Sequence, residues 1–334
     1  MTTLRRCLAA LLTCALLLTA ASAAKITALV GGRLIDGWGG APVNASVVLI
    51  EGDRILAAGP GDTIAIPAGA EIIDCAGMSI LPGLWDMHVH TMLLGHSDYT
   101  HWDKTYPARF ESEIMPAAAR QLLLAGVTSA RDLGAPLEAS VNVRERIKRG
   151  EIPGPTLYVS GPFIQHRPYP GTEDFRWGVD GVADAREKVR RIAQAGADVI
   201  KLIDQDQMTF EEVQAVVDEA HKQHLPVVAH AHRPDGVPAD IAEDIARSLK
   251  HPGWLAYYQI TPLRARTSAQ KFQQLRDSGA VLLIGTDSGI PMKFHNQSTW
   301  RELDIWVNQL GMDPMETIRA ATYWPAVAMK VDRD

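Results

Sequence analysis

Cysteine is scarce in this sequence, and most of it stands near the amino terminus. Cys7 and Cys14 precede residue 20, and Cys75 is the only other cysteine. A chain that loses its first residues on export keeps one thiol, which excludes an internal disulfide. We therefore expect stability to come from an apolar core, for which 46% hydrophobic residues in 334 are sufficient, and from bound metal.

Excess positive charge is also absent. The sequence has 33 Lys and Arg against 39 Asp and Glu, a net charge of -6, so no basic surface for nucleic acid is expected. Beyond the amino terminus, no stretch approaches the roughly 18 unbroken apolar residues of a membrane span. These absences indicate a globular protein that binds neither nucleic acid nor, once its leader is removed, a membrane.

The first 23 residues have the pattern of a signal peptide. Two arginines precede an apolar run from residue 7 to 20, and Ala21-Ser22-Ala23 follows it. A positive start, a short apolar centre and small residues at the cleavage point are typical of export. Cys14 could instead carry a lipid, although apolar residues continue past it. We expect residues 1–23 to be removed and the protein to be exported, either periplasmic or secreted.

The rest of the sequence has two parts with different patterns. Residues 24–80 carry short β-type runs at 26–30, 46–50 and 54–58 between glycine turns, which indicates a small β module. From residue 81 to 334, apolar strands alternate with amphipathic helices, which favours parallel βα units. This pattern predicts an α/β protein with a (β/α)8 TIM-type barrel, whose chemistry lies at the strand carboxyl ends.

About seven barrel strands can be counted, so the predicted barrel is incomplete. The candidates are Leu84–His90, Val127–Leu133, Thr156–Ser160, Asp198–Ile203, Pro226–His232, Leu255–Thr261 and Val281–Asp287. From His230 to Asp287 the chain has 57 residues, whereas three βα steps of roughly 30 residues each would need more. One unit is missing from the pattern.

Two His-x-His pairs stand at the ends of predicted strands. His88 and His90 end the first strand of the barrel, and His230 and His232 end the fifth. Residues i and i+2 of a strand point to the same face, so both imidazoles of a pair can reach one cation. Either pair alone could be two core histidines, but two pairs on separate strand ends favour a metal site.

Lys201 and Asp287 also fall at strand ends. An amine at the barrel mouth loses solvation, which favours its neutral, nucleophilic form and lets it capture carbon dioxide as a carbamate. A lysine that snorkels from a strand end is the plainer alternative. Asp287 follows a buried strand, where a carboxylate can bind a metal or act as a general base, or merely cap the next turn.

Five ordered motifs carry a resemblance to a known family. They are Leu81-Pro82-Gly83-Leu84-Trp85-Asp86-Met87-His88-Val89-His90, Gly126-Val127-Thr128-Ser129-Ala130-Arg131-Asp132, the Lys201 strand, Val228-Ala229-His230-Ala231-His232 and Gly285-Thr286-Asp287. Together they resemble the amidohydrolase superfamily and, more narrowly, its Xaa-Pro dipeptidase and imidazolonepropionase-like branch. The resemblance covers nearly all of the chain after the leader.

The resemblance implies a binuclear centre, usually zinc, in a barrel with a small amino-terminal β-sandwich. His88, His90 and Asp287 would hold one metal, Lys201 as carbamate would bridge, and His230 would hold the other. His232 would polarise the scissile carbonyl. Asp287 would take the proton of the bridging hydroxide and pass it to the departing amine.

The sequence departs from this family at one metal ligand. The family places a second histidine for the other metal about twenty positions after the first, and only His251 has that separation here. It follows a helical pattern and precedes Pro252-Gly253, so an exposed histidine at a helix end is the alternative. We hypothesise an internal deletion near residues 235–239. The family also continues beyond the point where this chain stops, so we expect a carboxyl-terminal truncation that leaves the sandwich partial.

These features predict a metal-dependent amidohydrolase that cleaves an amide bond in a dipeptide or an N-acyl amino acid. Hydrolysis of a cyclic amide or lactone is a second enzymatic reading. The competing hypothesis is a catalytically dead or truncated barrel of the same family. The expected partner is a small-molecule amide. The expected cofactors are two divalent metal ions, with Zn²⁺ as the first choice. The sequence is compatible with a homo-oligomer.

Overall fold

The computed structural model describes residues 25–96, 98–230 and 268–333. The chain forms two compact units, with the division between Pro82 and Gly83. The predicted signal peptide, the predicted strand Leu255–Thr261, the predicted catalytic residue His232 and the candidate ligand His251 lie outside the described residues. Among the helices of the described segments, none has the length and apolar character to span a membrane.

The first unit is built from strands: β1 (Ile26–Val30), β2 (Arg33–Leu34), β3 (Ser46–Glu51), β4 (Arg54–Pro60), β5 (Glu71–Asp74) and β6 (Ser79–Ile80). Four of them form one sheet in the order β4-β3-β1-β5, and β2 pairs with β6. Ala28, Val47 and Leu49 make its small core. The predicted β runs are confirmed in position. The strand pairing does not confirm a sandwich, which stays a prediction.

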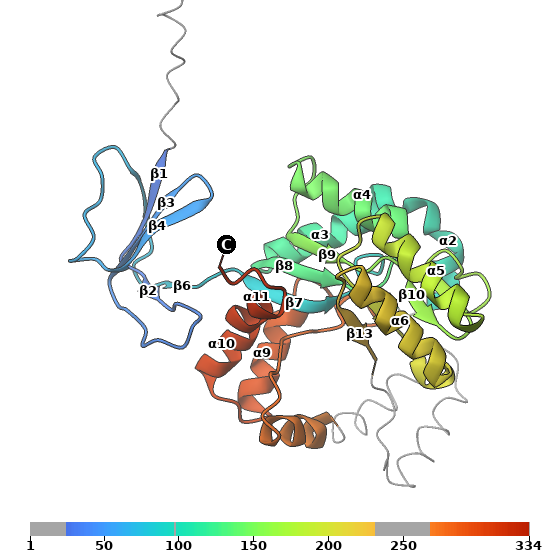
Figure 1. Ribbon diagram of the computed structural model, residues 1–334. Helices are drawn as coiled ribbons and strands as arrows, with labels where there is room; N and C mark the ends of the chain where they lie inside the picture. The colour runs from blue at the N-terminus through green and yellow to red at the C-terminus, as the bar shows by residue number, and fades with distance from the viewer. Residues whose placement is uncertain (1–24, 97, 231–267, 334) are drawn as a thin grey trace, which may run out of the picture. The chain divides into compact units, whose positions relative to one another are not determined.

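The second unit alternates strands and helices, as the sequence predicted (Figure 1). Its strands are β7 (Leu84–Val89), β8 (Val127–Asp132), β9 (Thr156–Val159), β10 (Phe163–Gln165), β11 (Arg176–Gly178), β12 (Ile200–Leu202) and β13 (Val227–Ala229). Besides a helix over residues 268–277, its helices and helical turns are α2 (Tyr99–Thr105), η1 (Pro107–Arg109), η2 (Phe110–Ile114), α3 (Met115–Leu124), α4 (Leu137–Lys148), α5 (Gly181–Gln194), η3 (Gln205–Gln207), α6 (Phe210–Lys222), α9 (Ser298–Asn308), α10 (Pro314–Ala321) and α11 (Tyr323–Ala328).

Two parallel sheets organise the second unit. One has the order β7-β8-β9 and the other β11-β10-β12-β13, with every pair parallel. Asp198, just before β12, joins them, because its backbone N–H donates to the Val159 carbonyl at 2.8 Å and its carboxylate accepts from the Val159 N–H at 2.8 Å. The strands of the described residues form an open parallel array and do not close into a barrel, and the predicted strand Leu255–Thr261 lies outside these residues.

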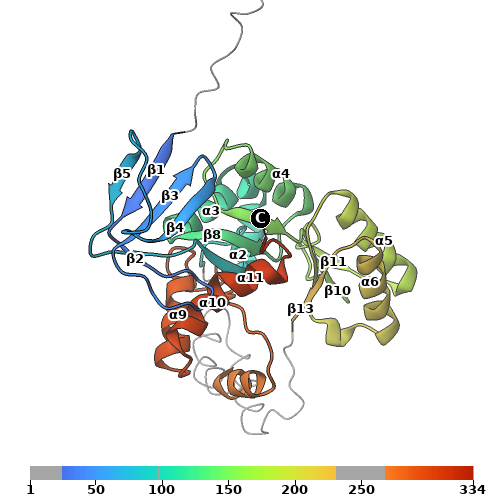
Figure 2. The same cartoon turned by 60° about the vertical axis from the view of Figure 1, so that its left-hand side comes forward.

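Amphipathic helices cover the second sheet. Val189 and Ile192 of α5 and Val216 of α6 pack against Ile164 and Ile200 of the strands in one buried cluster. Figure 2 shows α5 and α6 together on one side of these strands. Helix α6 begins at a capping box, in which the Thr209 hydroxyl accepts from the Glu212 N–H and the Glu212 carboxylate accepts from the Thr209 N–H.

The predicted last strand, Val281–Asp287, lies beside β7 without regular strand geometry. The Met87 N–H donates to the Ile284 carbonyl at 2.8 Å, and the His90 N–H donates to the Ser288 carbonyl at 2.8 Å. Val89 and Ser288 form a parallel bridge. The segment therefore binds to β7 as a parallel strand would, at the place that the barrel prediction gave it.

A buried carboxylate fastens this segment to β7. Asp86 Oδ1 accepts from the N–H of Thr286 at 3.0 Å and from the N–H of His88 at 3.2 Å. Its Oδ2 accepts from the hydroxyls of Thr286 at 2.7 Å and Thr299 at 2.9 Å. Burial raises the pKa of Asp86, and the hydrogen bonds from Thr286, His88 and Thr299 oppose that rise.

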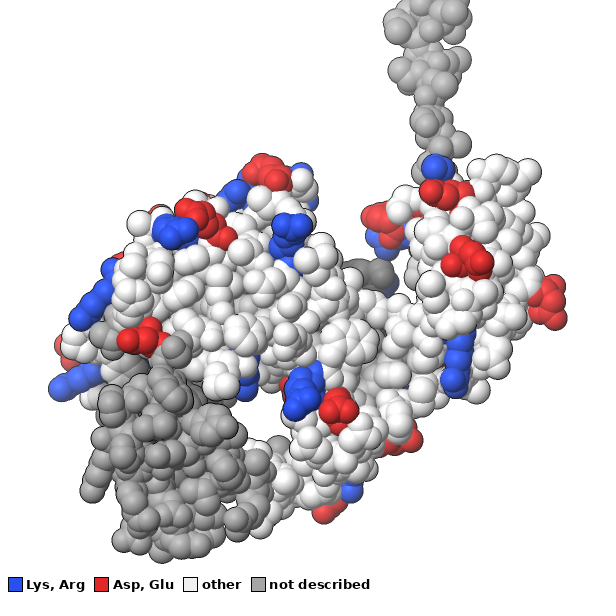
Figure 3. All heavy atoms as spheres, turned by 180° about the vertical axis from the view of Figure 1, so that it is seen from behind, with Lys and Arg blue, Asp and Glu red and all other residues white. Residues whose placement is uncertain are grey.

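Over the described residues, the face shown in Figure 3 has no patch of charges of one sign. Acidic and basic residues lie interspersed there. Exposed ion pairs occur on the chain, such as Arg149 with Glu151 at 2.6 Å. Exposed pairs of this kind contribute little to stability.

We expect Asp86→Ala to lower the free energy of unfolding by about 3 kcal/mol or more, because it leaves several buried donors without an acceptor. Urea unfolding followed by circular dichroism measures the effect. Asp304→Ala, which removes an exposed carboxylate on α9, is the matched control and should change stability by less than about 0.5 kcal/mol. Equal losses in the two variants would contradict the role assigned to Asp86.

Candidate metal centre

The first two candidate ligands stand where β7 ends. His88 and His90 alternate with Met87 and Val89, which are buried in the core with 2% and 0% of their surface exposed. The alternation turns both imidazoles to the other face of the strand. Their ring centres lie 5.2 Å apart, edge to face, and His90 is almost fully buried.

Asp287 joins the two histidines from the neighbouring segment. Its backbone N–H donates to the His88 carbonyl at 2.7 Å. Its Oδ1 lies 3.0 Å from His90 Nε2 and 3.5 Å from His88 Nε2. Each of the three residues offers one ligand atom, and these three atoms all lie within 4.8 Å of one another. The structure therefore brings three of the predicted ligands to one point.

The backbone conformation at Asp287 and Gly289 lets this segment pass close to β7. Asp287 has a φ of 59°, in the left-handed region that few non-glycine residues adopt. Gly289 has a φ of 104°, and a Cβ there would lie 2.3 Å from the His90 carbonyl oxygen. Only glycine allows the chain to pass so close to β7.

The chemistry of these groups fits a divalent cation. Burial, together with the charge of His90, holds the pKa of His88 well below its ordinary value, so the imidazole is neutral and keeps a lone pair. Its buried Nε2 has no hydrogen-bond partner. Burial alone would raise the pKa of Asp287, but the hydrogen bond from His90 and the charges of His90 and His88 hold it well below the usual range. Imidazoles and a carboxylate are typical ligands of Zn²⁺.

Lys201 lies in the middle of β12 with 1% of its surface exposed. It is in register with Phe163 of β10 on one side and Val228 of β13 on the other. Burial lowers the pKa of Lys201 to about 8, opposed by the charge of Asp287 and assisted by that of Arg131. A lysine with this pKa is partly neutral at pH 7, as carbamate formation requires.

His230 follows β13 and lies near the cluster. The centre of its ring is 5.7 Å from that of His88, and its backbone N–H donates to the Leu202 carbonyl at 3.2 Å. Both His230 and Lys201 act electrostatically on His88. The two remaining candidates, His232 and His251, lie outside the described residues, so their place stays a prediction.

Two buried carboxylates next to the ligand segments, Asp86 and Asp132, were given no role from the sequence. Asp86 holds the backbone of both ligand segments, as described above, and Asp132 at the end of β8 accepts from the N–H of Thr91 at 3.3 Å and from its hydroxyl. Burial raises the pKa of Asp132 to about 6, against the Thr91 hydrogen bond. A signal existed for both, since a charged residue inside an apolar strand is rarely buried without a partner.

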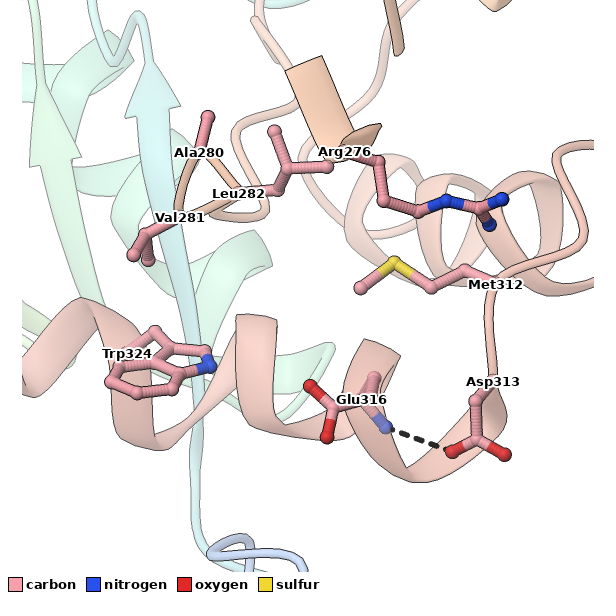
Figure 4. A pocket seen from close by; sticks show the side chains of 8 residues that line it. All are labelled: Arg276, Ala280, Val281, Leu282, Met312, Asp313, Glu316 and Trp324. Carbon is pink, nitrogen blue, oxygen red and sulfur yellow. Dashed lines mark hydrogen bonds between the residues drawn. The ribbon is translucent and has the colours of Figure 1, made fainter. Parts of the chain in front are cut away.

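The hollow drawn in Figure 4 is not the candidate site. It has a volume of about 380 Å³ and lies at the start of the segment whose far end carries Asp287. None of the candidate ligands lines it; its walls are Arg276, Ala280, Val281, Leu282, Met312, Asp313, Glu316 and Trp324. The Asp313 carboxylate there is occupied in capping α10, because it accepts from the N–H of Glu316 at 3.1 Å.

Among known proteins, ochratoxinase of Aspergillus niger is 26% identical to this chain over 391 residues, with 92% of the chain and 77% of that protein covered. An alignment of that length exceeds the whole of this 334-residue chain, so many positions of the relative have no counterpart here.

Solved structures of low identity share the fold. A crystal structure of a Xaa-Pro dipeptidase with methionine bound in the active site superposes with a TM-score of 0.72 at 21% identity, over 92% of this chain and 89% of that one. The crystal structure of A. niger ochratoxinase gives 0.71 at 23% identity, over 92% and 85%. These likenesses establish a TIM-like α/β architecture.

The family itself is established by sequence. The model of the amidohydrolase family matches residues 79–261, more than half of the chain, and this range contains the His88 and His90 pair, Lys201 and His230. The ordered motifs, the parallel array and this match agree. The chain belongs to the amidohydrolase family, whose members are hydrolases that act on carbon–nitrogen bonds.

Proposed function

We propose that this chain is a metal-dependent hydrolase that cleaves the amide bond of a dipeptide or an N-acyl amino acid. The observation that carries the proposal is the convergence of His88, His90 and Asp287, whose ligand atoms lie within 4.8 Å of one another. The Xaa-Pro dipeptidase among the similar solved structures supports it, as does the methionine bound in the active site of that protein.

The residues divide into two ligand groups. His88, His90 and Asp287 would hold one Zn²⁺ ion, and His230 would hold the second, with Lys201 between them. A bound zinc ion supplies a nucleophile at neutral pH, because it lowers the pKa of the water that it holds toward 7. The 5.7 Å between the rings of His88 and His230 suits two ligand groups that face one mouth.

Lys201 would bridge as a carbamate. Its neutral amine forms a bond from Nζ to the carbon of carbon dioxide, and the amine proton leaves to solvent. The product has two oxygens and one negative charge, which suits a position between two cations. The burial that lowers the pKa of Lys201 to about 8 favours the reactive amine.

Asp287 would move the proton. Its carboxylate accepts a proton from the attacking water and passes it to the nitrogen of the departing amine. Hydrogen bonding to His90 Nε2 at 3.0 Å fixes the carboxylate on the side of the ligands. His232, which lies outside the described residues, would polarise the scissile carbonyl.

A second candidate is a family member that binds fewer metals and does not hydrolyse amides. The positions of ochratoxinase that lack a counterpart here favour it. The helical pattern before His251, the one histidine at the spacing of the family's second ligand, also favours it. Metal content separates the two candidates.

We expect the purified protein to hold about two zinc ions per chain after dialysis, and Lys201→Ala to hold one or none, because the bridge is lost. Mass spectrometry of the metals measures both. Lys188→Ala, which removes a lysine paired with Asp184 on α5, should keep the wild-type content. One ion or none in the wild type would support the inactive candidate.

We expect Asp287→Asn to lower kcat/KM for dipeptides and N-acyl amino acids by about 10²- to 10⁴-fold, the usual contribution of a general acid–base group. Release of the free amino acid is measured at matched metal content. Asp304→Asn is the control and should retain wild-type activity. Equal turnover by both variants would remove Asp287 from the reaction.

We also propose that the protein is exported through residues 1–23. Expression with and without these residues, followed by fractionation and mass determination, tests the proposal. The full chain should be found in the periplasm or medium with Ala24 as its first residue, and the shortened one should stay inside the cell. An uncleaved full chain in the cell would contradict export.

A further inference from the structure

Arg176, the first residue of β11, carries a guanidinium group among aromatic rings. Its guanidinium carbon lies 4.9 Å from the centre of the Phe163 ring, 4.7 Å from that of Tyr169 and 5.8 Å from that of Phe175. Attraction between the cation and the ring faces stabilises a charge in such surroundings. The residue as a whole is half-buried and is not closed off from solvent.

The hydrogen-bond donors of Arg176 are underused. Nη1 donates to Gln165 Oε1 at 3.1 Å, and the buried Nε has no hydrogen-bond partner. The charges of Asp204 and Asp103 act on the group, but in the described parts of the chain Arg176 forms no ion pair with a carboxylate. A planar group with five donors in a fork is suited to bind one carboxylate with two hydrogen bonds.

The two nearby acids do not occupy this fork. Asp204 accepts a hydrogen bond from the Tyr169 hydroxyl at 3.2 Å. Asp103 has a buried Oδ1 without a hydrogen-bond partner, and burial raises its pKa to about 6, opposed by the charge of Arg176. Arg176 therefore keeps both its charge and free donors.

The sheet directs Arg176 to the same face as Lys201. Phe163 of β10 is in register with Arg176 of β11 on one side and with Lys201 of β12 on the other. Figure 2 shows β10 and β11 side by side. Residues in register on paired strands have their side chains on one face of the sheet. The Phe163 ring also contacts the His90 ring, with 5.7 Å between their centres.

These contacts limit the distance from Arg176 to the metal ligands. The guanidinium carbon lies 4.9 Å from the Phe163 ring centre and this centre 5.7 Å from that of His90, so the guanidinium is at most about 11 Å from the His90 ring. One amino-acid residue spans about 3.5 Å, and a charged hydrogen bond adds about 2.8 Å. A substrate with its amide at the ligands and a carboxylate one residue away needs about 6 Å, which is within this limit.

We propose that Arg176 binds the carboxylate of the amino acid that the reaction releases, with Phe163 packing against the same part of the substrate. The inference rests on the proposed amide hydrolysis and adds to it the residue that recognises the free carboxylate of these substrates, which lies one residue from the scissile bond.

Hydrolysis of N-acetyl-L-methionine and of its carboxamide tests this subsite, with released acetate as the readout. The wild type should prefer the acid by at least tenfold in kcat/KM. Arg176→Gln should lose at least tenfold for the acid, mainly through KM, and change little for the carboxamide. Arg176→Lys, which keeps the charge without the fork, should fall between the two. Equal losses for acid and carboxamide would overturn the proposal.

Arg149→Gln is the matched control, because it removes an exposed arginine that pairs with Glu151. It should leave both substrates unaffected. Thermal unfolding of each variant separates loss of the subsite from loss of the fold, and if Arg176→Gln does not fold, Arg176→Lys alone decides the outcome.

Calorimetric titration with L-methionine and L-methioninamide measures binding without hydrolysis. It therefore tests the carboxylate subsite separately from the proposed function. Binding of the acid that weakens at least tenfold in Arg176→Gln, in a protein without hydrolytic activity, would support the subsite and refute the function. Hydrolysis that is insensitive to Arg176 would support the function and refute the subsite. A protein that neither binds nor hydrolyses the acid would refute both.

Discussion

The candidate site depends on the contact between β7 and the segment that ends in Asp287. These stretches are two hundred residues apart in sequence, and Asp86 joins them through the backbone and the hydroxyl of Thr286. The same carboxylate accepts from the N–H of His88, so one buried acid holds both sides of the site. Displacement of either strand by one residue would turn its ligands to the other face.

Burial puts the candidate ligands in the forms that bind metal. It removes the proton from His88 and makes part of Lys201 neutral, while the imidazoles keep Asp287 ionised. A buried cluster of this kind is costly while its lone pairs face no cation, because several polar groups are then poorly compensated. This cost fits the proposed metal centre, and the fold provides the energy that keeps the ligands together.

Phe163 connects the proposed chemistry with the proposed recognition of substrate. Its ring contacts His90 on the side of the ligands and Arg176 on the side of the proposed carboxylate. The strands of one sheet thus carry both Lys201 and Arg176, in register with this phenylalanine. A reaction centre and a subsite on the same rigid sheet keep a fixed separation, which selects substrates by length.

The sequence by itself determined the order of the elements and the family. Apolar runs with turn residues between them placed β7, β8, β9 and β13 within a few residues, and His-x-His at a strand end indicated a metal site, because both signals are local. The family resemblance also predicted that Asp287 meets His88 and His90, and the structure brings the three together. Only the tertiary structure decided that Asp86 fastens their segments and that Arg176 shares a sheet face with Lys201. Strands β10 and β11 have three residues each, too few for a period to appear in the sequence. Their pairing, like every contact between distant segments, depends on packing that no local pattern records.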